Sequence, residues 1–250
     1  GLGDVYKRQA MNNVSLREGV MISHFEMLSD WQWYRRRGGS NKTTIQRYMS
    51  NWAEMLAPAT PHLAEEFWDS LGLDGLLASK TLSDLSDLSS KDWSHTLAME
   101  EYLRELIDSA RNIKILAQKH SEKPLTKMVI QTSPLWKSEL ASDAIEMSLS
   151  DFDFRAKGQD YLKNLPIFSN ESLRGEIFQT WMSMTSGTKK KRGRINTWSY
   201  GQKTLLRNGF DESSMINMNS SFIANSLGIE NVESYRAVSY THLTLPTSYA

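Results

Sequence analysis

Apolar side chains recur every three or four residues through the first half of the chain, and this spacing predicts amphipathic helices. The first helix is expected to end at Gly38 and Gly39, because glycine ends helices well and three arginines precede the pair. The second is expected to end at Pro58, since the residue before a proline avoids helical backbone angles. Thr60 and Pro61 then begin a third helix, with threonine as its cap and proline in its first turn.

A fourth helix is predicted from Met99 to Ala117, after a connection rich in Ser and Asp at 79–94. Because the connections are mostly short, the four segments are expected to form an antiparallel helical bundle. Glu65 and Glu66 are interpreted as a solvated first turn of the third helix. The side chains expected in the bundle interior are Val14, Met21, Phe25 and Leu28; Ile45, Tyr48, Met49, Trp52, Met55 and Leu56; Leu63, Phe67, Trp68 and Leu71; and Met99, Leu103, Leu106, Ala110, Ile113 and Ala117.

After Pro124 the sequence changes character. A strand is predicted at 128–132 and a helix at 136–149, followed by mixed polar and basic sequence. Near the end, a helix at 221–227 is expected to stop at a glycine before a strand at 232–235. We therefore predict a mainly α fold, in which the bundle is followed by a small α+β carboxy-terminal domain.

The two ends of the chain fit neither pattern. Residues 1–9 and 237–250 resemble translated sequencing-adaptor sequence. We expect the natural segment to span about Ala10 to Arg236. Within it, the bundle is assigned to 10–122 and the α+β domain to 123–236.

Composition restricts the classes of function. The chain has no cysteine, which excludes disulfides and thiolate metal sites. No apolar run approaches the roughly 18 residues of a membrane span, and the amino terminus lacks the order of a signal peptide. A cytoplasmic location and no membrane partner are therefore expected.

The formal net charge is zero, with 29 basic and 29 acidic side chains, but the two signs are segregated. Residues 61–105 are rich in Asp and Glu, whereas no acidic residue lies between Glu176 and Asp211. Flat side chains at Trp198 and Tyr200 follow the cations at 189–194 of this acid-free segment, a mixture that suits phosphates and exposed bases. A solvated basic loop is the alternative interpretation. The cations of the segment are Lys189, Lys190, Lys191, Arg192, Arg194, Lys203 and Arg207.

No constellation of catalytic residues can be identified. The five histidines have no partner at metal-ligand spacing, and no phosphate-binding glycine loop follows a strand. The tryptophans at 31, 33, 52 and 68 are interpreted as bundle core rather than as stacking platforms. We therefore predict no catalytic residue, no metal ligand and no cofactor in this chain.

One contiguous run carries a family resemblance. Met55-Leu-Ala-Pro-Ala-Thr-Pro-His-Leu-Ala-Glu-Glu-Phe-Trp68 resembles a signature of the class I aminoacyl-tRNA synthetases for leucine, isoleucine, valine and methionine, in their helical anticodon-binding domain. Ala59 departs from it, since the family usually has an aromatic residue there. The signature positions are Pro58, Thr60, Pro61, His62, Glu65, Glu66 and Trp68.

The flanking sequence is similar to the archaeal and eukaryotic-cytosolic leucyl enzymes. The similar stretches are Leu16-Arg17-Glu18, Phe25-Glu26-Met27, Trp33-Tyr34-Arg35-Arg36, Arg111-Asn112-Ile113, Lys127-Met-Val-Ile130, Leu135-Trp136-Lys137 and 222–235. The resemblance covers about Ala10 to Arg236 and is weak between 150 and 210.

The resemblance implies that the chain is a tRNA-binding piece of a leucyl enzyme, with tRNA(Leu) as partner and no DNA. The whole enzyme would charge tRNA with leucine using ATP and Mg²⁺, but the His-Ile-Gly-His and Lys-Met-Ser-Lys-Ser signatures of its catalytic domain do not occur here. This piece is therefore expected to be inactive alone. The candidate RNA contacts are Arg35, Arg36 and Arg37, together with the cations of the acid-free segment and Trp198.

Two alternatives remain open from the sequence. The second interpretation, after the leucyl one, is the corresponding piece of a valyl, isoleucyl or methionyl enzyme, because these enzymes share the 55–68 signature; they read anticodons. The neutral net charge and the acidic stretch 61–105 also suit a helical protein-interaction module with no role in nucleic-acid binding.

Overall fold

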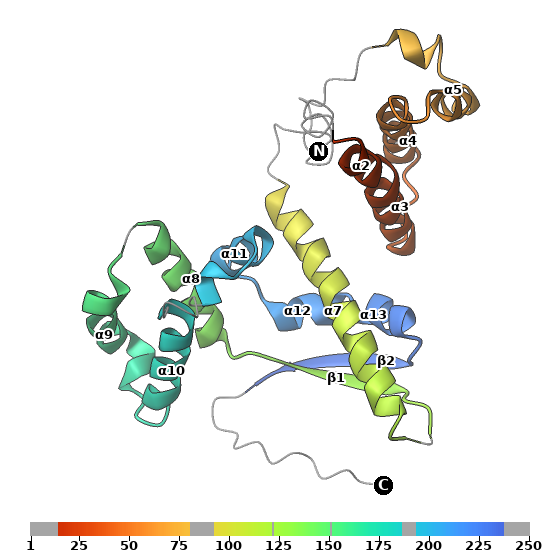
Figure 1. The fold of residues 1–250 in the computed structure, drawn as a ribbon. Coiled ribbons are helices and arrows are strands. Elements are labelled where there is room, and N and C mark those ends of the chain that lie inside the picture. The colour runs from red at the N-terminus through yellow and green to blue at the C-terminus, as the bar shows by residue number, and fades with distance from the viewer. Residues whose placement is uncertain (1–14, 81–92, 122, 151, 187–193, 238–250) are drawn as a thin grey trace. The chain divides into compact units, whose positions relative to one another are not determined.

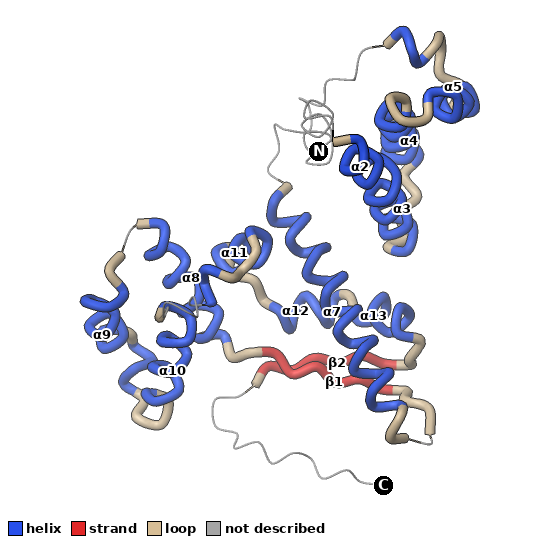
Figure 2. The backbone as a smooth tube through the Cα atoms, viewed as in Figure 1, coloured by secondary structure: helices blue, strands red, loops and turns tan. Residues whose placement is uncertain are grey.

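A computed structural model describes residues 15–80, 93–121, 123–150, 152–186 and 194–237 (Figure 1). The predicted connection at 79–94 and the two predicted adaptor ends lie mostly outside these ranges. The chain divides into two compact units between residues 92 and 93. The fold class is confirmed: the described residues are mainly helical, with one small parallel sheet (Figure 2).

Unit 1 consists of helices joined at the predicted breaks. Its elements are α2 (Leu16–Val20), the π-helical turn η1 (Met21–Glu26), α3 (Met27–Arg36), α4 (Lys42–Leu56), α5 (Pro61–Ser70) and the 3₁₀ turn η2 (Leu77–Ser79). Gly38 ends the first helical segment with a left-handed backbone (φ +83°), a conformation that glycine adopts without steric cost. The helix boundaries at Pro58 and Pro61 are confirmed.

The π-helical turn corrects the predicted face of the first helix. A π turn spans one residue more than an α turn, so it rotates the side chains that follow it. As a result Ile22 and Ser23 are buried, whereas Met21 and Phe25, predicted to be core, are 46 % and 54 % exposed.

Side chains of α4 stabilise the region of this turn. The indole Nε1 of Trp52 donates a hydrogen bond to the backbone carbonyl of Ser23 (2.7 Å), and the Tyr48 hydroxyl donates one to the carbonyl of Met27 (2.6 Å). Both contacts are tertiary and cannot be read from the periodicity of the first helix alone.

The core of unit 1 lies between α4, α5 and η2. It contains Ala53, Leu56, Ala64, Trp68 and Leu77. Leu56 and Trp68 were predicted there, but Leu63 is exposed, because Ala64 occupies the buried side of that turn of α5. The rings of Trp31, Tyr48, Trp52 and Phe67 contact one another in sequence, with centroids 6.1 to 6.2 Å apart.

Unit 2 begins with the long helix α7 (Ser94–Gln118). Leu103 and Ala110 are buried as predicted, together with Ala98 and Ile107. Ile113 and Ala117 were expected in the bundle interior but are exposed. Because this fourth helix of the predicted bundle belongs to unit 2, its packing against the first three stays a prediction.

The remaining elements of unit 2 alternate between a sheet and a helical lobe. They are β1 (Lys127–Thr132), α8 (Leu135–Leu149), α9 (Phe154–Asn164), the 3₁₀ turn η3 (Pro166–Ser169), α10 (Arg174–Thr185), the 3₁₀ turn η4 (Arg194–Asn196), α11 (Tyr200–Arg207), α12 (Glu212–Met218), α13 (Ser220–Leu227) and β2 (Asn231–Arg236). The strands β1 and β2 and the helices α8 and α13 were predicted from the sequence and are confirmed.

The sheet has two parallel strands that are far apart in sequence. Lys127 pairs with Asn231 and Thr132 with Arg236, so the two carboxyl ends of the strands lie together. Helices α12 and α13 pack on β2, and α13 also contacts α7. Val232 is 2 % exposed on this covered side.

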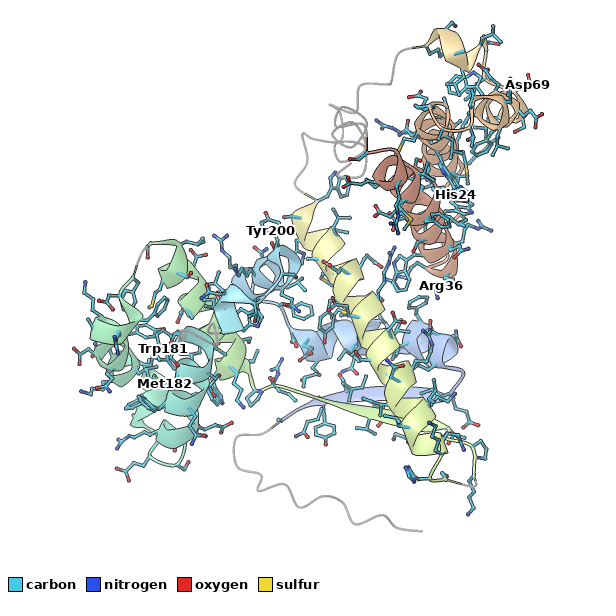
Figure 3. All side chains as sticks on the ribbon, viewed as in Figure 1. His24, Arg36, Asp69, Trp181, Met182 and Tyr200 are labelled. Carbon is cyan, nitrogen blue, oxygen red and sulfur yellow. The ribbon has the colours of Figure 1, made fainter. Side chains whose placement is uncertain are left out.

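The helical lobe of α8, α9, α10 and η4 has its own core. Trp136, Leu162, Ile177, Trp181 and Ile195 are among its buried members. Trp181 lies inside this lobe (Figure 3) and is 1 % exposed. Helix α11 contacts both α8 and α7, and it therefore joins the lobe to the rest of unit 2.

The helices between residues 150 and 210 were not predicted. Two of them, α9 and α11, begin at side-chain caps: Asp153 accepts from the backbone N–H groups of Arg155 and Ala156, and Ser199 forms a capping box with Gln202. The Ser-x-x-Gln spacing at 199–202 is a sequence signal from which α11 could have been predicted.

Candidate nucleic-acid interface

Most of the predicted cationic segment lies outside the described residues. The cations that are not described are Lys189, Lys190, Lys191 and Arg192. The description resumes at η4, where Ile195 is buried in the lobe core. Ile195 therefore anchors η4, and with it the backbone of Arg194, to the lobe.

The aromatic residues after this segment differ in exposure. Trp198 is half-buried and packs against the lobe core, whereas Tyr200 is 78 % exposed at the start of α11 (Figure 3). Trp198 was predicted as a candidate RNA contact, and its ring lines a cleft that is described below.

Two further predicted cations lie on α11, one helical turn apart. Lys203 is half-buried, and Arg207 is paired with Glu146 of α8, its Nε close to Oε1 of the carboxylate. This ion pair offsets the charge of Arg207, so its attraction for a phosphate is weaker than the sequence suggests.

The arginines of the α3 end form a separate group in unit 1. The guanidinium of Arg35 lies 5.7 Å from the ring centroid of Trp31 and donates to the carbonyl of Gly39. That of Arg36 lies 5.1 Å from the ring of Trp33. Arg37 is half-buried at the helix end. The structure thus orients Arg35 and Arg36 on aromatic rings, in a different unit from Lys203.

The signature residues form a structural corner in unit 1. Thr60 was expected to cap α5, but its hydroxyl donates back to the carbonyl of Leu56 (3.3 Å) instead. Glu65 is not merely solvated as predicted: its carboxylate accepts the backbone N–H groups of Leu77 (2.9 Å) and Ala78 (2.7 Å). The carboxylate of Glu65 therefore fixes η2 against α5.

Other positions of the signature complete the corner. Trp68 is buried beneath the ammonium of Lys80, which lies 4.5 Å from its ring. Pro58 and Pro61 bound the turn, while His62 and Glu66 are exposed. Trp68 is thus a core residue, as predicted, and the signature at residues 55–68 stabilises the packing of unit 1.

Unit 2 contains a cleft of about 440 Å³ that the sequence did not predict. It lies at the carboxyl ends of both strands, where Thr132 and Arg236 are paired. Helices α7, α8, α10, α11 and α12 supply its other walls, with Tyr102, Trp198 and Phe210 as its aromatic side chains. Since the lining comes from elements far apart in sequence, no local motif marks it.

Charged groups at this cleft are held by specific partners. Arg236 donates to Asp211 (2.7 Å), and this hydrogen bond holds the pKa of the Asp211 carboxyl below its usual range. The hydroxyl of Tyr102 donates to Glu212, and burial, aided by this carboxylate, raises the pKa of Tyr102. Tyr102 therefore remains a neutral donor at physiological pH.

The described residues include no group of three His, Asp or Glu side chains placed to hold a metal ion. None of the helices in the described ranges is both long and apolar enough to cross a bilayer.

Comparison with known proteins gives a family match for the first half. Residues 7–129 match the anticodon-binding domain of tRNA ligases. The leucine–tRNA ligase of Methanococcus maripaludis strain C7 is 33 % identical over 122 residues, which cover 48 % of this chain and 12 % of that protein. That of Methanothrix thermoacetophila is 33 % identical over 139 residues, or 56 % of this chain and 14 % of the relative.

A longer match extends into unit 2. The leucine–tRNA ligase of Methanococcus maripaludis strain S2 is 27 % identical over 210 residues, covering 79 % of this chain and 20 % of that protein. In these alignments the chain spans 12 to 20 % of the length of its relatives. The family match ends within β1, whereas the compact units divide between residues 92 and 93, so the predicted boundary at 122–123 stays a prediction.

Proposed function

We propose that this chain, which belongs to the leucine–tRNA ligase family and matches the anticodon-binding domain of tRNA ligases at residues 7–129, binds tRNA. The observation that carries this proposal is the family match over the helices of unit 1 and α7. The partner is tRNA(Leu), since the relatives that match are leucine–tRNA ligases. DNA and membranes are not among its partners.

The cationic side chains supply the attraction for phosphates. Of the seven cations between 189 and 207, Arg207 is neutralised by Glu146. Six remain, and six phosphate contacts give a slope of log K against log salt of roughly −4 to −5. Arg35, Arg36 and Arg37 add a second basic group at the end of α3.

Leucine activation and transfer are proposed for the longer ligase rather than for this chain. The catalytic signatures of class I enzymes do not occur in its sequence, so ATP and Mg²⁺ would bind a domain outside it. The chain contributes recognition of tRNA to a translation enzyme of the cytoplasm.

Binding of a tRNA(Leu) transcript at several salt concentrations tests this proposal. A variant with Lys189, Lys190 and Lys191 each changed to Glu is expected to bind more weakly and to lower the magnitude of the salt slope by about 2 to 3. A matched control reverses three exposed lysines elsewhere, Lys119, Lys123 and Lys157, and should lose far less affinity.

The identity of the tRNA is tested by competition. Unlabelled tRNA(Leu) is expected to displace the bound transcript at lower concentration than tRNA(Ile) or tRNA(Val). Equal competition would refute the leucyl assignment, and the absence of tRNA binding even at low salt would refute the proposed function as a whole.

A further inference from the structure

The cleft of unit 2 has the place and the size of a ligand site. It lies at the carboxyl ends of β1 and β2, the edge at which parallel sheets commonly bind their ligands. Its volume of about 440 Å³ is within the range of small-molecule pockets. A single nucleotide or nucleobase fits within such a volume.

The charges at the cleft disfavour a phosphate in its interior. Its two cations are already paired: Lys137 with Glu176 (2.7 Å) and Arg236 with Asp211 (2.7 Å). Three carboxylates line it, from Glu105, Asp211 and Glu212, so the lining carries one more negative than positive group. A phosphate would be repelled, whereas an uncharged group that donates hydrogen bonds would be favoured.

Flat apolar surface accompanies these acceptors. The rings of Tyr102 and Phe210 meet edge to face with centroids 5.1 Å apart, and half-buried Trp198 lines the same cleft. Aromatic rings beside polar groups are the combination with which proteins bind unstacked bases. The hydroxyls of Ser138 and Ser183 lie on the walls from α8 and α10.

One aromatic residue of the cleft is close in sequence to the predicted cations. Trp198 follows the cations of residues 189–194 by a few positions, and η4 anchors the intervening chain to the lobe.

From these observations we infer that the cleft binds an unpaired nucleobase that carries an exocyclic amino group, namely adenine, cytosine or guanine. The carboxylates accept hydrogen bonds from that amino group, and the aromatic rings pack on the base. Acidic side chains accept hydrogen bonds from the amino group of cytosine in nucleic-acid complexes. Uracil has no exocyclic amino group, and at the position of the cytosine amino group it presents a carbonyl oxygen, which the carboxylates would repel. This inference rests on the proposed binding of RNA and specifies where a base is read.

Short single-stranded RNAs test the inference directly. Fluorescence anisotropy would compare labelled oligo(C) and oligo(A) with oligo(U) on the full 250-residue chain. All three share the phosphate contacts, and oligo(C) and oligo(A) are expected to bind on the order of tenfold more tightly than oligo(U). Equal affinity for the three would overturn the inference.

Variants that fill the cleft provide the second arm. Ser183→Phe on α10 and Ser138→Phe on α8 each add a ring to the lining and remove no cation. Each should therefore abolish the preference for oligo(C) while leaving the affinity for oligo(U) and the salt slope unchanged. Glu105→Gln should reduce the preference without filling the space. Ser109→Phe on the exposed side of α7 is the matched control and should keep it.

The outcomes separate this inference from the proposed function. If the chain binds oligo(U) and tRNA but the filled variants retain the preference for oligo(C), bases are read elsewhere and the cleft assignment is wrong. If no RNA binds, the proposed function has failed. Circular dichroism melting curves confirm that each variant is folded before its affinity is compared.

Discussion

Replacing Gly158 by alanine tests how closely helix α9 approaches the indole of Trp181. A β-carbon at position 158 would lie 2.9 Å from the indole Nε1 and 3.6 Å from Cε2. The indole is 1 % exposed, and the rings of Phe154 and Tyr161 lie 5.7 and 5.1 Å away, so it has little room to shift. Any side chain at Gly158 would disturb the lobe that forms one wall of the cleft.

Two effects of opposite sign decide the outcome. Alanine in place of glycine inside a helix stabilises by about 0.5 to 1 kcal/mol, whereas overpacking a rigid core costs about 1 to 3 kcal/mol. We expect overpacking to dominate, because the whole indole would have to move, and predict a net loss of about 1 to 2 kcal/mol. At Gly175 in α10, where no atom lies within 4 Å of the added carbon, only the favourable effect acts.

Thermal and urea unfolding, followed by tryptophan fluorescence, compare the two variants. For a protein of this size each kcal/mol shifts Tm by about 2 to 4 °C. Gly158→Ala should lower Tm and Gly175→Ala should raise it slightly. Equal upward shifts would show that α9 does not contact Trp181 as closely as described, and the reasoning would be refuted.

Two other predictions concern a backbone contact and ionisation. Glu65→Ala should destabilise unit 1 by about 1 to 3 kcal/mol, since two backbone N–H groups of η2 lose their acceptor. Glu66→Ala, at the exposed neighbouring position, should change the urea midpoint very little. Equal effects of the two variants would contradict the role of the Glu65 carboxylate in holding η2. Burial and a carboxylate partner raise the pKa of Tyr102 and Tyr161, so the folded state keeps both protons above pH 10 while the unfolded state releases them. The stabilisation from these two tyrosines is therefore fully present below about pH 10 and falls as pH rises further. An ultraviolet titration should show that two of the nine tyrosines ionise only on unfolding. Ionisation of all nine near pH 10 in the folded protein would disprove the burial of Tyr102 and Tyr161.

The predictable parts of this fold depend on neighbouring residues. Pro58 and Pro61 fix helix ends through their own backbone, and Gly228 ends α13 in a left-handed conformation that glycine favours. Such signals act over a few positions, so they can be read directly from the sequence.

The unpredicted parts depend on contacts between distant residues. The side-chain rotation at Met21 and Phe25 follows from a π turn in which the carbonyl of Ser23 accepts from Trp52 of α4. The pairing of Arg207 with Glu146 reduces a positive charge that the sequence presents as free. Likewise, Tyr102 faces the cleft only because α7 and α12 are brought together, and no spacing in the sequence records that contact.

The parallel pairing of β1 with β2 also determines the order in which unit 2 can assemble. Because Lys127 pairs with Asn231, β1 has no partner strand until almost all of the described chain has been synthesised. The lobe of α8 to α10 makes mostly local contacts and can form earlier, whereas the sheet requires closure of a long loop. During translation β1 would therefore expose an unpaired edge until β2 leaves the ribosome, and in this interval the nascent chain is most vulnerable to aggregation and to binding by chaperones.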